Sequence, residues 1–201
     1  MRLWGMLLIL LTCASGACGD DGGSTTDGGG SDGGSASGDA PMMMTDAAII
    51  GEPPELAGIT DAHNVVRAMV QTSTPLMPLA WSDALEATAK AYGMMCINND
   101  GNSIMDHNPN RSAGHPYQVG ENIYASGGTA TAQGAVQLWA AEKANYVYPN
   151  GYSPATGHYT QIVWRTTREV GCALVNCPNI QFPSTIICDY GPAGNGSGPP
   201  Y

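Results

Sequence analysis

Lysine and arginine are scarce in this chain of 201 residues, which contains seven of them against 17 aspartates and glutamates. The imbalance lies mainly in one segment. Residues 19–59 carry eight acidic groups and no basic group, whereas residues 60–201 carry nine acidic and six basic groups. Neither segment offers the basic stripe that nucleic acid binding requires, so the sequence excludes nucleic acid as a partner. The more balanced segment is long enough to form one stable domain.

A long hydrophobic run is also missing. The apolar stretch from Leu3 to Leu11 is too short to span a bilayer as a helix. It follows a basic residue and precedes several small residues, and these are the three parts of a secretory signal. We therefore predict a signal peptide over residues 1–18 and export of the chain, which allows its cysteines to oxidise.

Cys18 resembles the lipidated cysteine of bacterial lipoproteins, because Gly16 and Ala17 precede it and a polar tail follows it. Cleavage near Ala17 without lipidation is the alternative. The first case predicts a cell-surface lipoprotein that meets the membrane only through the lipid on Cys18. The second predicts a protein secreted freely into the extracellular space.

The acidic segment has the composition of a tether. From Asp20 to Asp39 it contains glycine, serine, aspartate and threonine with a single alanine and no large apolar side chain. Such a segment cannot bury enough surface to offset its ordering entropy. We predict a disordered acidic linker over residues 19–55 and a folded domain over residues 56–201.

Apolar residues at helical spacing predict three helices in the first part of this domain. The first covers about residues 60–71, the second begins at Ser82, and the third covers about residues 131–145. The predicted buried faces consist of Val65, Val66, Met69 and Val70, then Leu85, Ala89, Tyr92, Met95 and Cys96, and finally Val136, Trp139 and Ala140.

Alternating and β-branched residues predict three antiparallel strands over residues 160–164, 170–177 and 185–190. The loop from Pro178 to Phe182 would close a hairpin in which the numbers of paired residues sum to about 360. This register places Cys172 opposite Cys188. Directly opposed Cα atoms lie about 4.5–5.5 Å apart, a separation that a disulfide can bridge.

Cys177 cannot pair with Cys172 on the same strand, because residues five apart lie about 16 Å apart on opposite faces. Cys177 therefore faces the other layer, where Cys96 ends the second predicted helix. Of the three pairings that four cysteines allow, this geometry selects Cys96–Cys177 together with Cys172–Cys188. Export favours both bridges over free buried thiols.

Four sequence motifs follow one another along the folded segment: His63-Asn64-x-x-Arg67, Gly120-Glu121-Asn122-Ile123, Gly157-His158-Tyr159-Thr160-Gln161-Ile162-Val163-Trp164 and Cys188-Asp189-Tyr190-Gly191-Pro192-Ala193-Gly194-Asn195. In these motifs the chain resembles the CAP superfamily of cysteine-rich secretory proteins, antigen 5 and plant pathogenesis-related protein 1, also called the SCP domain. The similarity covers about Leu56 to Tyr201. It implies an α+β fold, a three-layer α-β-α sandwich with helices on both faces of a central antiparallel sheet.

The resemblance also implies a surface cleft in which two histidines and two glutamates converge. Glu121, Glu142 and His158 match three of these positions. The first histidine position falls on His107, with His115 as the alternative. Four further motif residues are implied to be structural: His63, Asn64, Arg67 and Asn122.

A cleft of this composition favours a binding module. Two neutral imidazoles and a carboxylate partner suit Zn²⁺ or another divalent cation, and some family members bind lipids or sterols at a separate apolar groove. The alternatives are a hydrolase, either metal-dependent or working by Glu/His acid–base chemistry, and a surface display domain with an inert cleft. We assign no catalytic residue, because the family's cleft places no serine or cysteine beside a base. A protein partner is left open.

Overall fold

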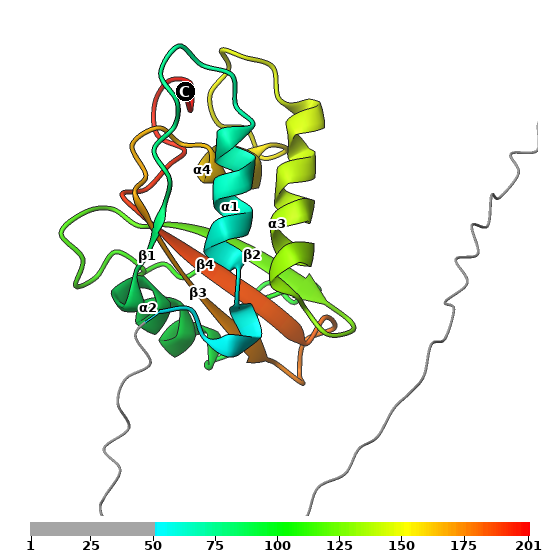
Figure 1. Cartoon of the computed structure of the whole chain (residues 1–201). Coiled ribbons are helices and arrows are strands. Elements are labelled where there is room, and N and C mark those ends of the chain that lie inside the picture. Colours follow the sequence, from blue (N-terminus) through cyan, green and yellow to red (C-terminus); the bar gives the residue numbers. More distant parts are fainter. Residues whose placement is uncertain (1–50) are drawn as a thin grey trace, which may run out of the picture. The chain divides into compact units, whose positions relative to one another are not determined.

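Four strands form one sheet at the centre of residues 51–201, the part of the chain that the computed structural model describes (Figure 1). The predicted signal peptide, Cys18 and the linker up to residue 50 lie outside the described residues. Across the sheet the order is β1 (Ala80–Trp81), β3 (Glu169–Asn176), β4 (Ser184–Gly191) and β2 (Gly120–Ser126). The helices are the short η1 (Pro54–Leu56), α1 (Ile59–Ala68), α2 (Asp83–Gly93), α3 (Ala132–Ala141), η2 (Glu142–Asn145) and α4 (Gly157–Ile162). None of these described helices has the length and apolar character needed to cross a membrane.

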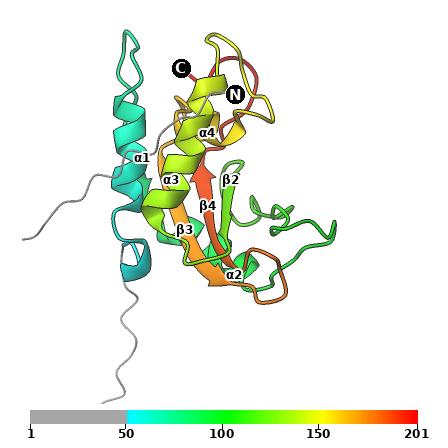
Figure 2. The same cartoon turned by 90° about the vertical axis from the view of Figure 1, so that its right-hand side faces the viewer.

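Helices cover both faces of the sheet (Figures 1 and 2). Side chains alternate along β4, so Cys188 and Tyr190 pack into one core with α1, α3 and α4, whereas Ile187 packs into another with α2. The predicted three-layer α-β-α sandwich is therefore confirmed. β4 pairs antiparallel with both β2 and β3, while the two-residue β1 pairs parallel with β3, which makes the sheet mixed at that edge.

The buried face of α1 differs from the prediction. Val65 and Met69 are 53% and 63% exposed, although both were assigned to the buried face. The fully buried positions are Ile59, His63 and Arg67, spaced four residues apart. Val66 and Val70 pack against the core as predicted. The prediction was wrong for the other two because it followed apolar residues, whereas this helix buries two polar side chains whose hydrogen bonds are made inside the protein.

The next two helices follow their predicted faces more closely. Three of the predicted residues of α2 are buried: Leu85, Ala89 and Tyr92. The other two, Met95 and Cys96, lie beyond the helix, which ends at Gly93. In α3, Val136 and Trp139 are buried as predicted.

Close packing of α2 on the sheet depends on Gly171 in β3. A Cβ atom at this position would lie 2.2 Å from the backbone nitrogen of Glu86 and 2.4 Å from the carbonyl oxygen of Ser82. Both atoms belong to backbone at the start of α2, which cannot rotate away as a side chain can. Glycine therefore sets how closely the helix approaches the strand.

The predicted strand over residues 160–164 is wrong, because the motif forms the helix α4 instead. At its N-terminal end, the backbone N–H groups of His158 and Tyr159 both donate to Oε2 of Glu142, at 2.9 and 3.0 Å. These groups have no partner within the helix itself. A carboxylate that lies 16 residues earlier in the chain therefore starts this helix.

Arg67 holds the other end of α4. Its Nη1 atom donates to the carbonyl oxygens of Ile162 and Trp164, at 2.7 and 3.0 Å, and its Nε atom donates to that of Met77 at 2.8 Å. Burial and the charge of Arg168 lower the pKa of Arg67 to about 10, so the guanidinium stays charged at neutral pH. The carbonyl groups that the short helix leaves free are thus satisfied from α1.

Both predicted disulfides are present. Cys172 and Cys188 are directly opposed on β3 and β4, with Cα atoms 4.1 Å apart, and Cys96 and Cys177 are bridged with a Cα separation of 5.4 Å. The residue numbers of paired positions on β3 and β4 sum to 360, as predicted. The first bridge lies in the core under α1 and α3, and the second joins the segment that follows α2 to the residue that follows β3.

Candidate functional site

His107 and Glu121 form the first of two histidine–carboxylate pairs. Nδ1 of His107 lies 2.6 Å from Oε1 of Glu121, and the backbone N–H of Asn108 donates to the same oxygen at 3.0 Å. The imidazole is 58% exposed, whereas the side chain of Glu121 is fully buried. Because Nδ1 donates its proton to the carboxylate, Nε2 of the neutral imidazole carries a free lone pair.

His158 and Glu142 form the second pair, with the same geometry. Nδ1 of His158 lies 2.6 Å from Oε1 of Glu142, whose other oxygen receives the backbone N–H groups at the start of α4. The imidazole also stacks on the indole of Trp139, with ring centroids 6.1 Å apart and planes inclined by 16°. A carboxylate and an aromatic surface therefore fix this ring in one orientation.

Both imidazoles line one cleft, a cavity of about 460 Å³ beside the edge strand β2. The other side chains that line it are mostly polar and include Arg111, Glu121, Asn122, Tyr152, Gln161 and Asn195. Glu142 does not line the cleft but lies behind His158. The structure thus brings His107, Glu121 and His158 to the cleft and places Glu142 in support.

His115, the alternative for the first histidine, lies elsewhere. Its Nε2 atom is 2.9 Å from Oγ1 of Thr88 on α2, and its ring stacks on Tyr117. It does not line the cleft. His107 is therefore the histidine that lines the cleft together with His158.

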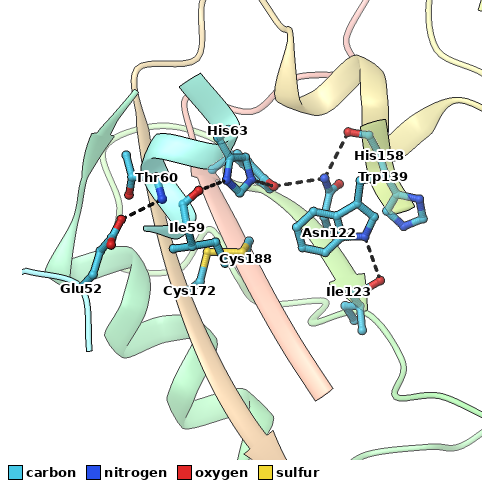
Figure 3. Close-up of a disulfide and its surroundings, with 11 residues drawn as sticks. Glu52, Ile59, Thr60, His63, Asn122, Ile123, Trp139, His158, Cys172 and Cys188 are labelled. Carbon is cyan, nitrogen blue, oxygen red and sulfur yellow. Dashed lines mark hydrogen bonds between the residues drawn. A yellow bond between two sulfur atoms is a disulfide. The ribbon is translucent and has the colours of Figure 1, made fainter. Parts of the chain in front are cut away.

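A chain of buried hydrogen bonds connects α1 to the backbone of His158 (Figure 3). Nδ1 of His63 donates to the carbonyl oxygen of Ile59, and the hydroxyl of Tyr190 donates to Nε2 of His63 at 2.8 Å. Nδ2 of Asn122 then donates to both that hydroxyl and the carbonyl oxygen of His158, each at 3.1 Å. Burial lowers the pKa of His63 to about 4, so this ring is neutral at neutral pH and has a structural role.

The remaining implied structural residue, Asn64, joins α1 to the segment before β1. Its amide donates to the carbonyl oxygen of Leu79 at 3.0 Å and accepts the backbone N–H of Leu79 at 2.7 Å. Asn64 and Arg67 therefore bond to backbone that is distant in sequence, and His63 bonds to the distant hydroxyl of Tyr190. None of the three faces the cleft.

Sequence reasoning missed several residues that shape the cleft. Gln161 lies beneath it, where its Oε1 atom accepts the backbone N–H of Gly194 at 2.9 Å. A Cβ at Gly120 would lie 2.0 Å from that same oxygen, so a larger residue there would displace the side chain of Gln161. The glycines within the Gly-Glu-Asn and Gly-Asn motifs were a usable signal for this close packing. Tyr152 gave no comparable signal, because it lies in an irregular loop.

The donor atoms decide which kind of metal centre the cleft fits. Among residues 51–201, no group of three or more histidine, cysteine, aspartate or glutamate side chains is arranged to hold a metal ion. A closed structural zinc site, which takes four protein ligands, is thus not built here. Two imidazoles, each with a carboxylate at its Nδ1 atom, offer two nitrogen donors, one fewer than the three protein ligands of an open zinc site.

A three-layer sandwich with two histidine–carboxylate pairs at the edge of its sheet defines the class of this domain. Residues 60–190 match the model of the CAP, or cysteine-rich secretory protein, family. The chain belongs to this family, which confirms the resemblance drawn from its four motifs.

Similar proteins are known from sequence and from structure. Over 137 residues, 67% of this chain and 74% of the relative, it is 39% identical to pathogenesis-related protein 1 of Arabidopsis thaliana. The structure of venom allergen-like protein 4 of Schistosoma mansoni has a TM-score of 0.59 and 26% identity, covering 75% of this chain and 95% of that one. The crystal structure of NaASP2 with Zn²⁺ has a TM-score of 0.55 and 25% identity, covering 71% of this chain and 81% of that one.

Proposed function

We propose that this chain is an exported binding module whose cleft takes a divalent cation, with Zn²⁺ as the first choice, through Nε2 of His107 and of His158. The observation that carries the proposal is the pairing of each Nδ1 atom with a carboxylate at 2.6 Å. This pairing fixes the tautomer and turns the lone pair of each ring toward the cleft.

The two glutamates then have a supporting role. Glu121 is buried and Glu142 lies behind His158, so each carboxylate orients its imidazole through Nδ1 without being a ligand itself. With two protein ligands, we expect binding weaker than that of closed four-ligand sites. The crystal structure of NaASP2 with Zn²⁺ supports zinc as the first ion to test.

Export is part of the proposal. The predicted signal peptide and two disulfides in the described residues suit an oxidising compartment. We propose that Cys18 carries a lipid and that the acidic linker holds the domain away from the membrane surface. Free secretion is the alternative.

Calorimetric titration of chelator-stripped protein with Zn²⁺ tests the metal site. We expect binding at neutral pH, a raised melting temperature and weaker binding in acid, because a protonated imidazole cannot ligate. His107→Ala and His158→Ala should each abolish the effect, whereas His115→Ala, which leaves the cleft intact, should not. If millimolar zinc gives no heat of binding and does not raise the melting temperature, the metal proposal is wrong.

A small lipid or sterol would occupy a separate site, and one groove favours this second function. A cavity of about 700 Å³ beside α2 is lined largely by apolar atoms, with Ala87, Ala91, Met95, Ile97 and Pro109 among its residues. Native mass spectrometry of the purified protein would detect a copurifying lipid. Delipidated protein that takes up no lipid would remove this candidate.

A hydrolase remains the alternative to both binding functions. The side chains that line the cleft among the described residues include the phenol of Tyr152 but no serine, threonine or cysteine. If the protein does turn over a substrate, Glu121→Gln should abolish turnover while circular dichroism shows an intact fold. A display domain with an inert cleft would show neither turnover nor ligand-dependent stability.

A further inference from the structure

A second cavity, of about 590 Å³, lies where the chain leaves the C-terminal ends of α1 and η2, and it shares no lining residue with the histidine cleft. We call it the tyrosine groove, because Tyr148, Tyr159 and Tyr201 line it. Lys143 and Arg165 line it as well. The proposed metal site makes no use of any of these five residues.

The tyrosines form a preorganised aromatic surface. The rings of Tyr148 and Tyr201 stack with centroids 5.7 Å apart and planes 6° apart, and Tyr146 packs edge-on against Tyr201 at 5.8 Å. The hydroxyl of the buried Tyr159 lies 3.4 Å from that of Tyr201. Tyr148 is nevertheless 60% exposed. A flat ring held from one side and open to solvent is a platform for another flat or ring-shaped group.

The groove is positively charged. Residues 60–201 contain only six basic residues, and two of them, Lys143 and Arg165, line this one groove. Both side chains are exposed, and no ion pair involving either is found among the described residues. The lining includes no carboxylate side chain. In a chain of net charge −10, this concentration of unpaired positive charge points to an anionic ligand.

We propose that the tyrosine groove binds an acidic oligosaccharide, with a uronic acid ring stacked on Tyr148 and its carboxylate held by Arg165 and Lys143. A guanidinium matches a carboxylate with two parallel hydrogen bonds, and an ammonium adds a point charge. The exposed amide of Gln71 and hydroxyl of Ser73 also line the groove and suit the sugar hydroxyls. A fatty acid fits less well, since the aliphatic lining consists of Met69 and Val70 alone.

The proposal stands independently of the metal site, although the two sites share structural elements. Glu142 supports the cleft and the next residue, Lys143, lines the groove; likewise His158 lines the cleft and Tyr159 lines the groove. Consecutive residues are thus divided between two sites. Substitutions can therefore separate the two functions.

Calorimetric titration of the full chain with a short oligogalacturonate tests the proposal, with the methyl-esterified form of the same oligosaccharide as the uncharged control. We expect the acid form to bind, the ester to bind about tenfold more weakly or not at all, and binding to weaken as salt is added. Arg165→Gln and Tyr148→Ala should each weaken binding about tenfold. Both residues are exposed, so the fold should be kept, and circular dichroism checks this.

Three comparisons keep the result decisive. Lys90→Gln removes an exposed positive charge on α2 and should leave binding unchanged. His158→Ala should also leave it unchanged, which separates this groove from the metal proposal. Equal affinity for the acid and the ester, an equal loss in Lys90→Gln, or no binding at millimolar oligosaccharide would overturn the proposal. The comparison of acid with ester uses the unaltered protein, so it decides even if Tyr148→Ala fails to fold.

Discussion

Glu121 of β2 and Asp189 of β4 are directly opposed in the sheet, and three of their four carboxyl oxygens are buried without a hydrogen-bond partner among residues 51–201. Burial and the negative charge of Glu121 raise the pKa of Asp189 to about 8, although the positive charge of Arg111 opposes this shift. Asp189 is therefore protonated at neutral pH. The interior behind the cleft holds one negative charge in place of two.

Asp189→Asn should change how stability depends on pH. In the unfolded chain this carboxyl titrates near pH 4, so between about pH 4 and pH 8 the folded state binds one more proton than the unfolded state. Stability must then fall as pH rises through this window. We expect the variant to lose this slope and to be about 4–5 kcal/mol more stable at pH 8, with little change at pH 4. Urea unfolding of metal-free protein at both pH values measures it, and an unchanged slope would contradict the assignment.

Arg67→Lys should destabilise the fold although it keeps the charge. One ammonium cannot reach the carbonyl oxygens of Met77, Ile162 and Trp164 that the guanidinium holds together. Leaving buried carbonyl groups unsatisfied should cost about 2–4 kcal/mol, measured by urea unfolding. Arg165→Lys, at an exposed position, should change stability by less than about 0.5 kcal/mol. Similar losses in both variants would show that Arg67 does not hold the end of α4.

Gly171→Ala should separate α2 from the sheet, because the added Cβ meets the helix backbone at 2.2 Å. We expect a loss of about 3 kcal/mol, since the backbone must shift to admit the methyl group. Gly127→Ala is the matched control, for its Cβ would lie 3.6 Å from the nearest atom, a ring carbon of Phe182. Thermal unfolding of both variants makes the comparison, and a tolerated alanine at residue 171 would refute the close-packing argument.

The Cys96–Cys177 bridge should contribute more to stability than Cys172–Cys188. It spans 81 residues against 16, so it restricts the unfolded chain more strongly. Replacing Cys96 and Cys177 together with alanine should cost about 2–5 kcal/mol, and the loop-length difference alone is worth about 1 kcal/mol. Unfolding of the two double variants tests this order. Non-reducing peptide mapping checks the pairing, which a Cys172–Cys177 peptide would contradict.

Cys18→Ser tests the predicted anchor. If Cys18 is lipidated, wild-type protein partitions into detergent and the variant moves to the soluble fraction, because the lipid is the only proposed membrane contact. Phase separation followed by mass spectrometry of the N-terminus measures both. Wild-type protein found wholly in the medium, with an unmodified N-terminus, would establish free secretion.

The disulfides and the β3–β4 hairpin could be predicted because both depend on local regularity. A strand register follows from the loop length, and opposed cysteines such as Cys172 and Cys188 follow from the register. The three-layer arrangement of helices and sheet was predicted from the resemblance in the four motifs. It was harder to predict the residues whose side chains form hydrogen bonds with backbone groups that are distant in sequence. The helix α4 was mistaken for a strand because its ends are held by Glu142 and Arg67, neither of which is near it in sequence.

The four cleft positions came from resemblance, since no periodicity links residues that lie on separate segments. The structure adds which atoms pair: Nδ1 of each imidazole lies 2.6 Å from a carboxylate oxygen. Asp189 shows the limit of motif reasoning. It was quoted only as part of a motif, and its burial beside Glu121 depends on a strand, β2, that the sequence did not reveal.

His107 and His158 reach the cleft from opposite sides of the sheet. The backbone of His107 is held by the hydroxyl of Tyr92 on α2, whereas His158 rests on Trp139 of α3, and β2 runs between them. A ligand bound by both imidazoles would therefore link the two helical layers across the edge of the sheet. The force needed to pull those layers apart should then be higher when the cleft holds a ligand than when it is empty.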